Sequence, residues 1–561
     1  MAYSEPQTAY TAWQPGIQSE LPKHLRAYDS LYQPGCSSIN YAQVMDLHRL
    51  TGIRAERLAA FTWQRLILHE LVVRVTADIV VPEGDDEEIL GRRFRDIIDT
   101  IQTTYVEPHT TQLRTAHEQL KQRVSQDVGQ LLDRTILDTP EQQKTKSGWR
   151  RWFGHTPKRP SVSIEEQQFN AIKQLREQGL QEQHDYQATV YKSMYVVLSA
   201  VATHRGRLPH DRELFVRLIS HHMMNDYGSR HMGRLLEPMV AAAIIGQNYQ
   251  PVENTDKPIL ISLKGASAAG KSTLRPLLYE DMVEHDLANQ NFATISPDIW
   301  RRLLLDYASL GEDFKYSGRL TSHEVNIIDG KLDRYIRAKA EHLQAIPNLL
   351  VDRFRFDSFN SKKIADVLHS TYVHYVDTMH MYFVITPPEA TVERGWLRGQ
   401  ERGRYKSVED FLGHSVEAYE GMPRLFFKWI AYTKPHYKYH FVDNDVPKGT
   451  APRLVAWGDQ NAMTIIDPLI LSNIDRYQKI NIHAPSPAEV YPQSRDMDIA
   501  NNCQFLQQCL RTLPLVKFAV SQDTLPYLQF AQNSPQITDS KVLQQVREQP
   551  QLASLLAQLM A

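Results

Sequence analysis

One octapeptide in this chain has the residue types and the spacing of a phosphate-binding loop. Residues 265–272 read GASAAGKS, a complete match to the pattern GxxxxGK[ST]. The glycines let the backbone approach a polyphosphate closely, so that amides and a helix N-terminus point at the anion. Lys271 is expected to reach the β- and γ-phosphates, and the Ser272 hydroxyl to complete a Mg²⁺ site. The residues expected to hold the nucleotide are Gly265, Ala266, Ser267, Ala268, Ala269, Gly270, Lys271, Ser272 and Thr273.

The segments on both sides of this loop have the patterns that phosphate binding requires. Residues 258–264 have the length and the branched apolar content of a buried strand, and residues 272–283 can continue as a helix. Pro276 is expected to kink that helix. The sequence therefore predicts a strand, a loop and a helix that bind ATP together with Mg²⁺.

Two aspartates follow other strand-like runs. Asp352 comes directly after residues 348–351 and can bind Mg²⁺ directly or through water, although a strand-end turn residue is the alternative. Asp298 follows residues 292–295 and can accept the proton of an acceptor hydroxyl. Its competing role is to cap a helix over residues 299–307, and one residue can do both.

A cluster of cations follows the fourth strand-like run. Its members, within thirteen residues, are Arg394, Arg398, Arg402, Arg404 and Lys406. Guanidinium groups can neutralise the charge that phosphoryl transfer spreads over the equatorial oxygens. The glycines between them favour a mobile lid, the alternative being a solvated helix face paired with Glu393 and Glu401. After the last strand, Asn444 is expected to contact the adenine.

Motifs elsewhere in the chain narrow the class of reaction that the phosphate-binding loop can serve. The sequence has no NKxD motif of the kind that GTPases use for guanine, and no Asp-Glu pair ends the strand at 348–351. We therefore expect a kinase that transfers the γ-phosphate of ATP to a hydroxyl of a small metabolite, with Lys271, Asp298, Arg394 and Arg404 as its catalytic residues. The alternatives are a polynucleotide or protein kinase, and an ATP-gated interaction protein whose helical flanks bind the partner.

These motifs together resemble the zeta toxin family of P-loop kinases over about residues 255–446. The matching places are Lys271 with Ser272, Asp298 followed by Arg301, Asp352 where the family usually has Glu, and residues 391–394 followed by Arg404. The resemblance implies that Asp298 deprotonates a sugar hydroxyl and that Arg394 and Arg404 grip the triphosphate. The best-known substrates of the family are UDP-N-acetyl amino sugars, and a related bacterial effector phosphorylates NAD.

The chain departs from the family after the third strand. Residues 353–356 replace its small Gly-rich turn, so the substrate is not carried over. Segment 315–337 is where an acceptor would be held, and it can equally be a charged amphipathic helix. Because helical antitoxins block the nucleotide site in that family, the helical flanks are candidates for in cis control. The alternatives are a docking scaffold that binds a protein partner and a substrate-binding module.

The elements that position these residues fall into six segments. Five strands, at 258–264, 292–295, 348–351, 379–385 and 439–442, predict an α/β P-loop kinase domain with a mainly parallel sheet. Mostly α-helical regions flank it. The expected segments are a loosely ordered or draped stretch at 1–40, a helical domain at 41–137, a basic linker or loop at 138–162, a helical region at 163–250, the kinase domain at 251–450 and a helical region at 451–561.

The composition of the chain limits its expected partners and cellular location. The chain has 561 residues, 42% of them hydrophobic and 23% charged, and a net charge of −2 gives no overall attraction to nucleic acid or membrane. Three cysteines without zinc spacing, and the lack of a classical signal or a membrane-spanning segment, favour the cytoplasm. Delivery by a non-classical secretion system is also compatible. Residues 149–153 (WRRWF) interleave aromatic and basic side chains and could touch a membrane or nucleic acid, although a linker is favoured.

Overall fold

A single mixed sheet organises the chain. The computed structural model describes residues 10–84, 87–137, 163–284, 291–353, 374–493, 495–498 and 501–561. Within them, ten strands form one sheet in the order β10-β9-β8-β7-β6-β5-β4-β1-β3-β2. The predicted basic linker at 138–162, with its WRRWF core, lies outside the described residues, as do residues 354–356.

The parallel half of the sheet coincides with the five expected strands. These are β1 (Ile259–Lys264), β2 (Phe292–Ile295), β3 (Asn348–Val351), β4 (Thr378–Ile385) and β5 (His436–Asp443). Every neighbouring pair among them is parallel, and β1 is buried at every position, as expected for a strand covered on both faces. The carboxyl ends of β1, β2 and β3 therefore meet at one edge, where the loops that follow them converge.

The sheet is twice as large as predicted, because residues 451–561 are not mostly helical. They contribute β6 (Arg453–Asp459), β7 (Ala462–Ile465), β8 (Leu515–Phe518), β9 (Leu528–Ala531) and β10 (Ser534–Ile537), besides the helices α16 (Pro468–Arg476), α17 (Gln504–Thr512), α18 (Ser540–Val546) and α19 (Pro550–Met560). Four of these strands have only four residues, and β10 is exposed at every position. In strands of four residues the hydrophobic alternation extends over too few positions to identify a strand, so only the Leu- and Gln-rich helical pattern was recognised in the sequence.

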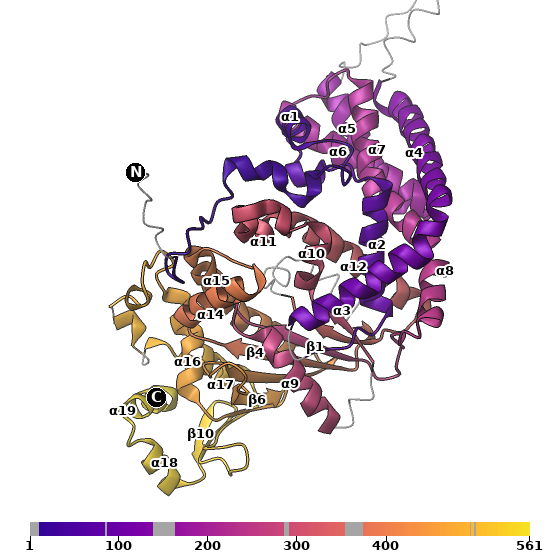
Figure 1. The fold of residues 1–561 in the computed structure, drawn as a ribbon. Helices are drawn as coiled ribbons and strands as arrows, with labels where there is room; N and C mark the ends of the chain where they lie inside the picture. Colours follow the sequence, from indigo (N-terminus) through magenta and orange to yellow (C-terminus); the bar gives the residue numbers. More distant parts are fainter. Residues whose placement is uncertain are drawn as a thin grey trace, which may run out of the picture.

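Helices cover the sheet around the loop edge. They are α9 (Lys271–Glu284), α10 (Arg301–Leu304), α11 (Ser317–Leu320), α12 (Ser322–Leu343), α14 (Pro388–Arg402) and α15 (Val408–Ile430). Helix α9 starts at the loop lysine and continues through Pro276. Figure 1 shows α14 and α15 on one side of the loop edge and α11 and α12 on the other.

A block of helices packs at the β2 edge of the sheet (Figure 1). Its members are α1 (Tyr41–Thr51), α2 (Trp63–Asp78), α3 (Glu87–Thr100), α4 (Thr110–Leu132), α5 (Ile164–Gln181), α6 (Asp185–Arg205), α7 (Arg212–Met223) and α8 (Ser229–Gly246). The helices predicted within residues 41–137 and 163–250 are confirmed. Helix α2 contacts α8, α12 and β2, so it joins the block to the sheet.

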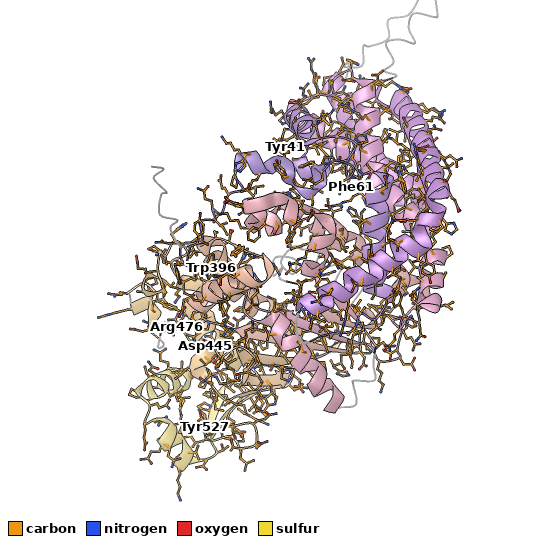
Figure 2. The ribbon with its side chains drawn as sticks, viewed as in Figure 1. Tyr41, Phe61, Trp396, Asp445, Arg476 and Tyr527 are labelled. Atoms are coloured by element: carbon orange, nitrogen blue, oxygen red, sulfur yellow. The ribbon has the colours of Figure 1, made fainter. Side chains whose placement is uncertain are left out.

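Side chains fill the spaces between these layers (Figure 2), and most of the buried apolar residues form one continuous cluster from the helical block through the sheet. Among the described helices, none is long and apolar enough to cross a membrane. The N-terminal segment, defined here as residues 10–32, runs from α14 and α15 towards α11 and α12 (Figure 1). It contains two short 3-10 turns, Lys23–Tyr28 and Ser30–Tyr32.

Candidate functional site

The loop between β1 and α9 has the backbone that phosphate binding needs. Gly270 has a φ of +94° and Ala268 a φ of +61°, both in the left-handed region. A Cβ on Gly270 would overlap the side-chain amide of Asn444, so glycine is required there on two grounds. The ammonium of Lys271 donates to the carbonyls of Gly265 (3.1 Å) and Ala266 (3.0 Å), and burial lowers its pKa. The lysine therefore lies over the loop.

Two cavities meet at this loop. The first, of about 700 Å³, contains Lys271 and Ser272 together with Asp298 and Asp352. The second, of about 310 Å³, lies beside α14 and the segment after β5. Its wall includes Thr273, Leu277, Arg394, Asn444 and Pro447. The residues that line both cavities are Ala268, Gly270, Ser272 and Arg398. One phosphate-binding loop thus has a charged space on one side and a less polar space on the other.

Asp298 lies after β2 between two arginines. Its carboxylate forms ion pairs with Arg301, 2.9 Å from Nε, and with Arg404. Burial alone would raise the pKa of Asp298, but Arg404 and Arg301 together hold it well below its ordinary value. The side chain makes no capping hydrogen bond, and the helix that follows covers only Arg301–Leu304, so the capping alternative fails. Asp298 is an ionised carboxylate that faces the first cavity.

Asp352 follows β3 and also lines the first cavity. Its Oδ2 is 3.5 Å from Nη1 of Arg275, a fully buried arginine on α9 whose Nε lies 3.1 Å from Glu83 Oε1. Burial raises the pKa of Asp352, while Lys271 and Arg275 act in the opposite direction. The aspartate is therefore part of a buried charge network and not a simple turn residue.

Arg275 and Glu83 were missed by the sequence reasoning. Arg275 carries a weak signal, since it lies four residues after Lys271 and hence on the same side of α9. Glu83 carries none, because it comes from the helical block 192 residues earlier.

The predicted cation cluster divides between the two cavities. Arg404 and Lys406 line the first, Arg394 lines the second, and Arg398 lines both. Arg394 donates to the carbonyl of Val446 at 3.0 Å. In the sequence, Arg398 was assigned a role only as a member of the cation cluster and was not predicted as a catalytic residue. The side chain of Arg402 lies outside what the structure describes.

Lys406 lies close to the loop. Its Nζ is 3.0 Å from Ser267 Oγ and 3.0 Å from His414 Nδ1. Burial, and then the neighbouring Arg404 and Arg398, lower the pKa of Lys406 well below its ordinary value. The same causes, burial and then Lys406, lower the pKa of His414 to about 2, so the imidazole is neutral and can accept from the lysine.

The glycines of this region have a different role from the one predicted. Residues 388–402 form a regular helix, α14, which ends at Gly403 with a φ of +69°. A Cβ on Gly395 would overlap the ring of Phe411, and a Cβ on Gly399 would overlap Tyr405. The glycines therefore allow close packing that offsets their low helix propensity. Trp396 of the same helix (Figure 2) also packs edge-on against Tyr405, with ring centroids 5.4 Å apart.

Asn444 supports the loop. Its Nδ2 donates to the carbonyl of Ala269 at 2.7 Å, and its backbone amide donates to Ile385. It also lines the second cavity, beside Arg394. Contact with an adenine stays a prediction, whereas the bond to the loop is observed.

The acceptor segment 315–337 forms α11 and most of α12. Ser322, Asn326 and Asp329 of α12 line the first cavity. On another face of α12, Glu324 and Lys331 are buried against α2 and α8. The helix therefore lines the cavity with one face and joins the helical block with another, and acceptor binding by this segment stays a prediction.

Magnesium fits this site only in combination with a phosphate ligand. In the described part of the chain, no three His, Cys, Asp or Glu side chains are grouped so that they could hold a metal ion. Ser272 and Asp352 both line the first cavity and offer a hydroxyl and a carboxylate oxygen. Mg²⁺ typically takes one or two protein oxygens together with substrate phosphates, which matches this donor set.

Comparisons with known proteins complete the description. No protein-family model matches the chain, and no curated protein matches it significantly. The crystal structure of AvrRxo1-ORF1:-ORF2 with ATP is similar over 46% of this chain and 76% of that one, at 14% identity and a TM-score of 0.33. A structure of the PezAT chromosomal toxin-antitoxin system of Streptococcus pneumoniae is similar over 40% of this chain and 80% of that one, at 17% identity and a TM-score of 0.27. Both TM-scores are below 0.5, so neither likeness carries an argument about this chain.

Proposed function

We propose that this protein is an ATP-dependent kinase that phosphorylates a hydroxyl of a small molecule. The observation that carries the proposal is the pair of cavities that share one phosphate-binding loop, with an ionised aspartate and several cations in the larger one. ATP on the loop would place its nucleoside in the 310 Å³ cavity, beside Arg394 and Asn444. Its γ-phosphate would then face Asp298 and the acceptor in the 700 Å³ cavity.

The proposed reaction uses groups that already surround the larger cavity. Asp298 takes the proton of the acceptor hydroxyl while that oxygen attacks the γ-phosphorus, and the bond to the β–γ bridging oxygen breaks to release ADP. Lys271, Arg398 and Arg404 neutralise the charge on the phosphoryl oxygens. Ser272 and Asp352 would hold Mg²⁺, which supplies charge neutralisation at the β- and γ-phosphates when bound.

The pairing of Arg404 suggests an order of events, in which ATP binds before Asp298 becomes an effective base. In the described structure it pairs with Asp298 and keeps the pKa of that carboxylate low, which makes Asp298 a weak base. A triphosphate offers Arg404 a second anionic partner. If Arg404 moves to the γ-phosphate, Asp298 loses one cation, its pKa rises and its basicity increases. ATP binding would thus prepare the base.

The direct test is label transfer. Purified protein is incubated with γ-labelled ATP, Mg²⁺ and fractionated small molecules, and the products are separated chromatographically. We expect one or a few labelled products from the wild type and none from Lys271→Ala. Asp298→Asn should reduce transfer by roughly 10²- to 10⁴-fold, the usual contribution of a general base, while ATP still binds. The absence of labelled product in every fraction, with ATP bound normally, would contradict the proposal.

A second candidate function is an ATP-gated interaction protein. The observation that favours it is the buried Glu83–Arg275–Asp352 chain, which links the loop edge to the helical block. Occupancy of the loop could therefore be transmitted to the helices. Very slow ATP turnover together with ATP-dependent binding of a protein partner would favour this candidate over the kinase.

A further inference from the structure

The N-terminal segment, residues 10–32, bridges the two sides of the first cavity. On one side, Trp13 Nε1 donates to Glu393 of α14 at 2.7 Å, and Ser19 Oγ lies 2.8 Å from Ser407 Oγ at the start of α15. On the other side, Lys315 Nζ donates to a carbonyl of the segment, that of Gly16, at 3.1 Å. The segment therefore connects the elements that carry the cation cluster to the elements that carry the acceptor side.

Apolar contacts seat the segment at both ends. Ala12 and Trp13 pack in a cluster with Phe411, and Leu25 is buried in a separate cluster with Leu310. The sequence predicts that residues 1–40 are loosely ordered or draped over the rest of the protein. The described residues 10–32 are draped over it. A segment held by hydrogen bonds and apolar packing on both sides is a fixed wall of the cavity and not a loose tail.

Several side chains of this wall line the first cavity. They are Ile17, Gln18, Glu20, Leu21, Arg26 and Asp29. The carboxylate of Asp29 is already used, since it lies 3.0 Å from His323 Nδ1 and accepts from the amide of Leu31. The half-buried guanidinium of Arg26 forms no hydrogen bond or ion pair with any residue that the structure describes.

Arg26 is therefore a cation at the cavity wall that pairs with none of the residues described in the structure. Lys315 and Arg319 line the same cavity from facing elements, although Arg319 already pairs with Asp410 at 3.4 Å and Lys315 donates to the carbonyl of Gly16. Arginine presents a planar fork of donors that suits a carboxylate or a phosphate group. The wall is thus suited to hold an anionic group at a distance from the loop.

We propose that the N-terminal segment is part of the acceptor site and that Arg26 binds an anionic group of the acceptor, away from the hydroxyl that receives the phosphate. This inference rests on the proposed kinase function and narrows the acceptor to a small, polar, negatively charged molecule. Arg26 is in this sense a specificity-determining residue. It takes no part in the transfer itself.

The test compares Arg26→Gln with Lys23→Gln. Lys23 is exposed on the same 3-10 turn and does not line the cavity, which makes it a matched control. The probe is the small-molecule extract of the expression host, used in a dilution series with γ-labelled ATP. Arg26→Gln should raise the half-saturating amount of extract roughly tenfold or more, the loss expected for a charge-assisted hydrogen bond. The half-saturating ATP concentration should change by less than about twofold.

Two further variants sharpen the result. Arg26→Lys should recover part of the lost affinity, because it restores the charge without the planar fork. Leu21→Trp should also weaken acceptor use, because it fills the cavity from the same wall. Melting temperatures of all variants are compared with that of the wild type to separate these effects from misfolding.

Three results of these experiments would contradict the inference. If Arg26→Gln and Leu21→Trp both match Lys23→Gln, the segment is not part of the acceptor site. If Arg26→Gln raises the half-saturating ATP and extract levels equally, the residue acts through nucleotide binding and the inference is wrong. If the wild type itself transfers no label, the kinase function fails and the acceptor-site inference falls with it.

Discussion

Replacing Glu324 by Gln is expected to destabilise the junction between α2 and α12 by about 3–5 kcal/mol, the cost of removing one partner from a buried ion pair. Glu324 is fully buried on α12. Its Oε1 lies 2.5 Å from Arg65 Nε, and its Oε2 accepts from Nη2 of the same arginine at 2.7 Å. His69 Nε2 is a further 2.7 Å from Oε1. The glutamine would leave the Arg65 guanidinium buried without a counter-charge.

The electrostatics of the site give a similar magnitude. Burial by itself would raise the pKa of Glu324, but Arg65 and His69 more than offset it and lower the pKa from 4.5 to about 2. This shift corresponds to about 3 kcal/mol in favour of the ionised, folded state. Because the folded pKa is depressed, this stability is fully present above pH 4.5 and is lost as the pH falls towards about 2.

The assay is denaturant unfolding followed by tryptophan fluorescence at several pH values. Glu341→Gln is the matched control, because Glu341 is exposed on the same helix. Glu324→Gln should unfold at a clearly lower denaturant concentration than the control at pH 7, and the difference should shrink as the pH falls below 4.5. Identical transitions of the two variants at pH 7 would refute the reasoning, as would a difference that does not depend on pH.

The junction also bears on function, because α12 lines the cavity with one face and meets the helical block with another. Lys331 of α12 donates to Ser229 Oγ at 2.7 Å and lies 2.9 Å from His69 Nδ1. Phe61, just before α2 (Figure 2), packs edge-on against His69 with ring centroids 4.7 Å apart. A loosened junction should therefore reduce acceptor use more than ATP binding.

Three other changes test the loop edge. Glu83→Gln should weaken the interaction of Arg275 with Asp352, so the Mg²⁺ concentration that half-saturates ATP binding should rise severalfold in calorimetric titrations. An unchanged Mg²⁺ dependence would mean that Arg275 does not influence the metal site. Asn444→Ala removes a hydrogen bond to the loop worth about 1 kcal/mol, so ATP affinity should fall roughly fivefold. An unaltered ATP affinity would mean that Asn444 contributes only to packing. Arg398→Gln should lower the rate of label transfer by roughly 10²-fold at saturating ATP, because the residue borders both cavities; a change in ATP affinity alone would remove it from the transfer step.

Local patterns carried most of the information on the parallel half of the sheet and on the phosphate loop. The loop could be predicted because its chemistry lies within a few consecutive residues, and β1 because a continuous apolar run is typical of a strand buried on both faces. Asp298 and Arg301 are three residues apart, so their ion pair is also a local feature. For residues 388–402 the sequence favoured a mobile lid over a helix, and the structure has the helix α14, because the packing of its glycines against Phe411 and Tyr405 outweighs their poor helix propensity.

The sequence by itself determined the position of the phosphate-loop motif and the residue types that surround it, because these depend on short-range spacing. Only the tertiary structure decided that Glu83 meets Arg275 across 192 residues, that the N-terminal segment lines the first cavity, and that five further strands extend the sheet. The reason is physical: buried ion pairs and cavity walls are stabilised by contacts between segments that are distant in the sequence, and strands of four residues have too few alternating positions to be recognised alone.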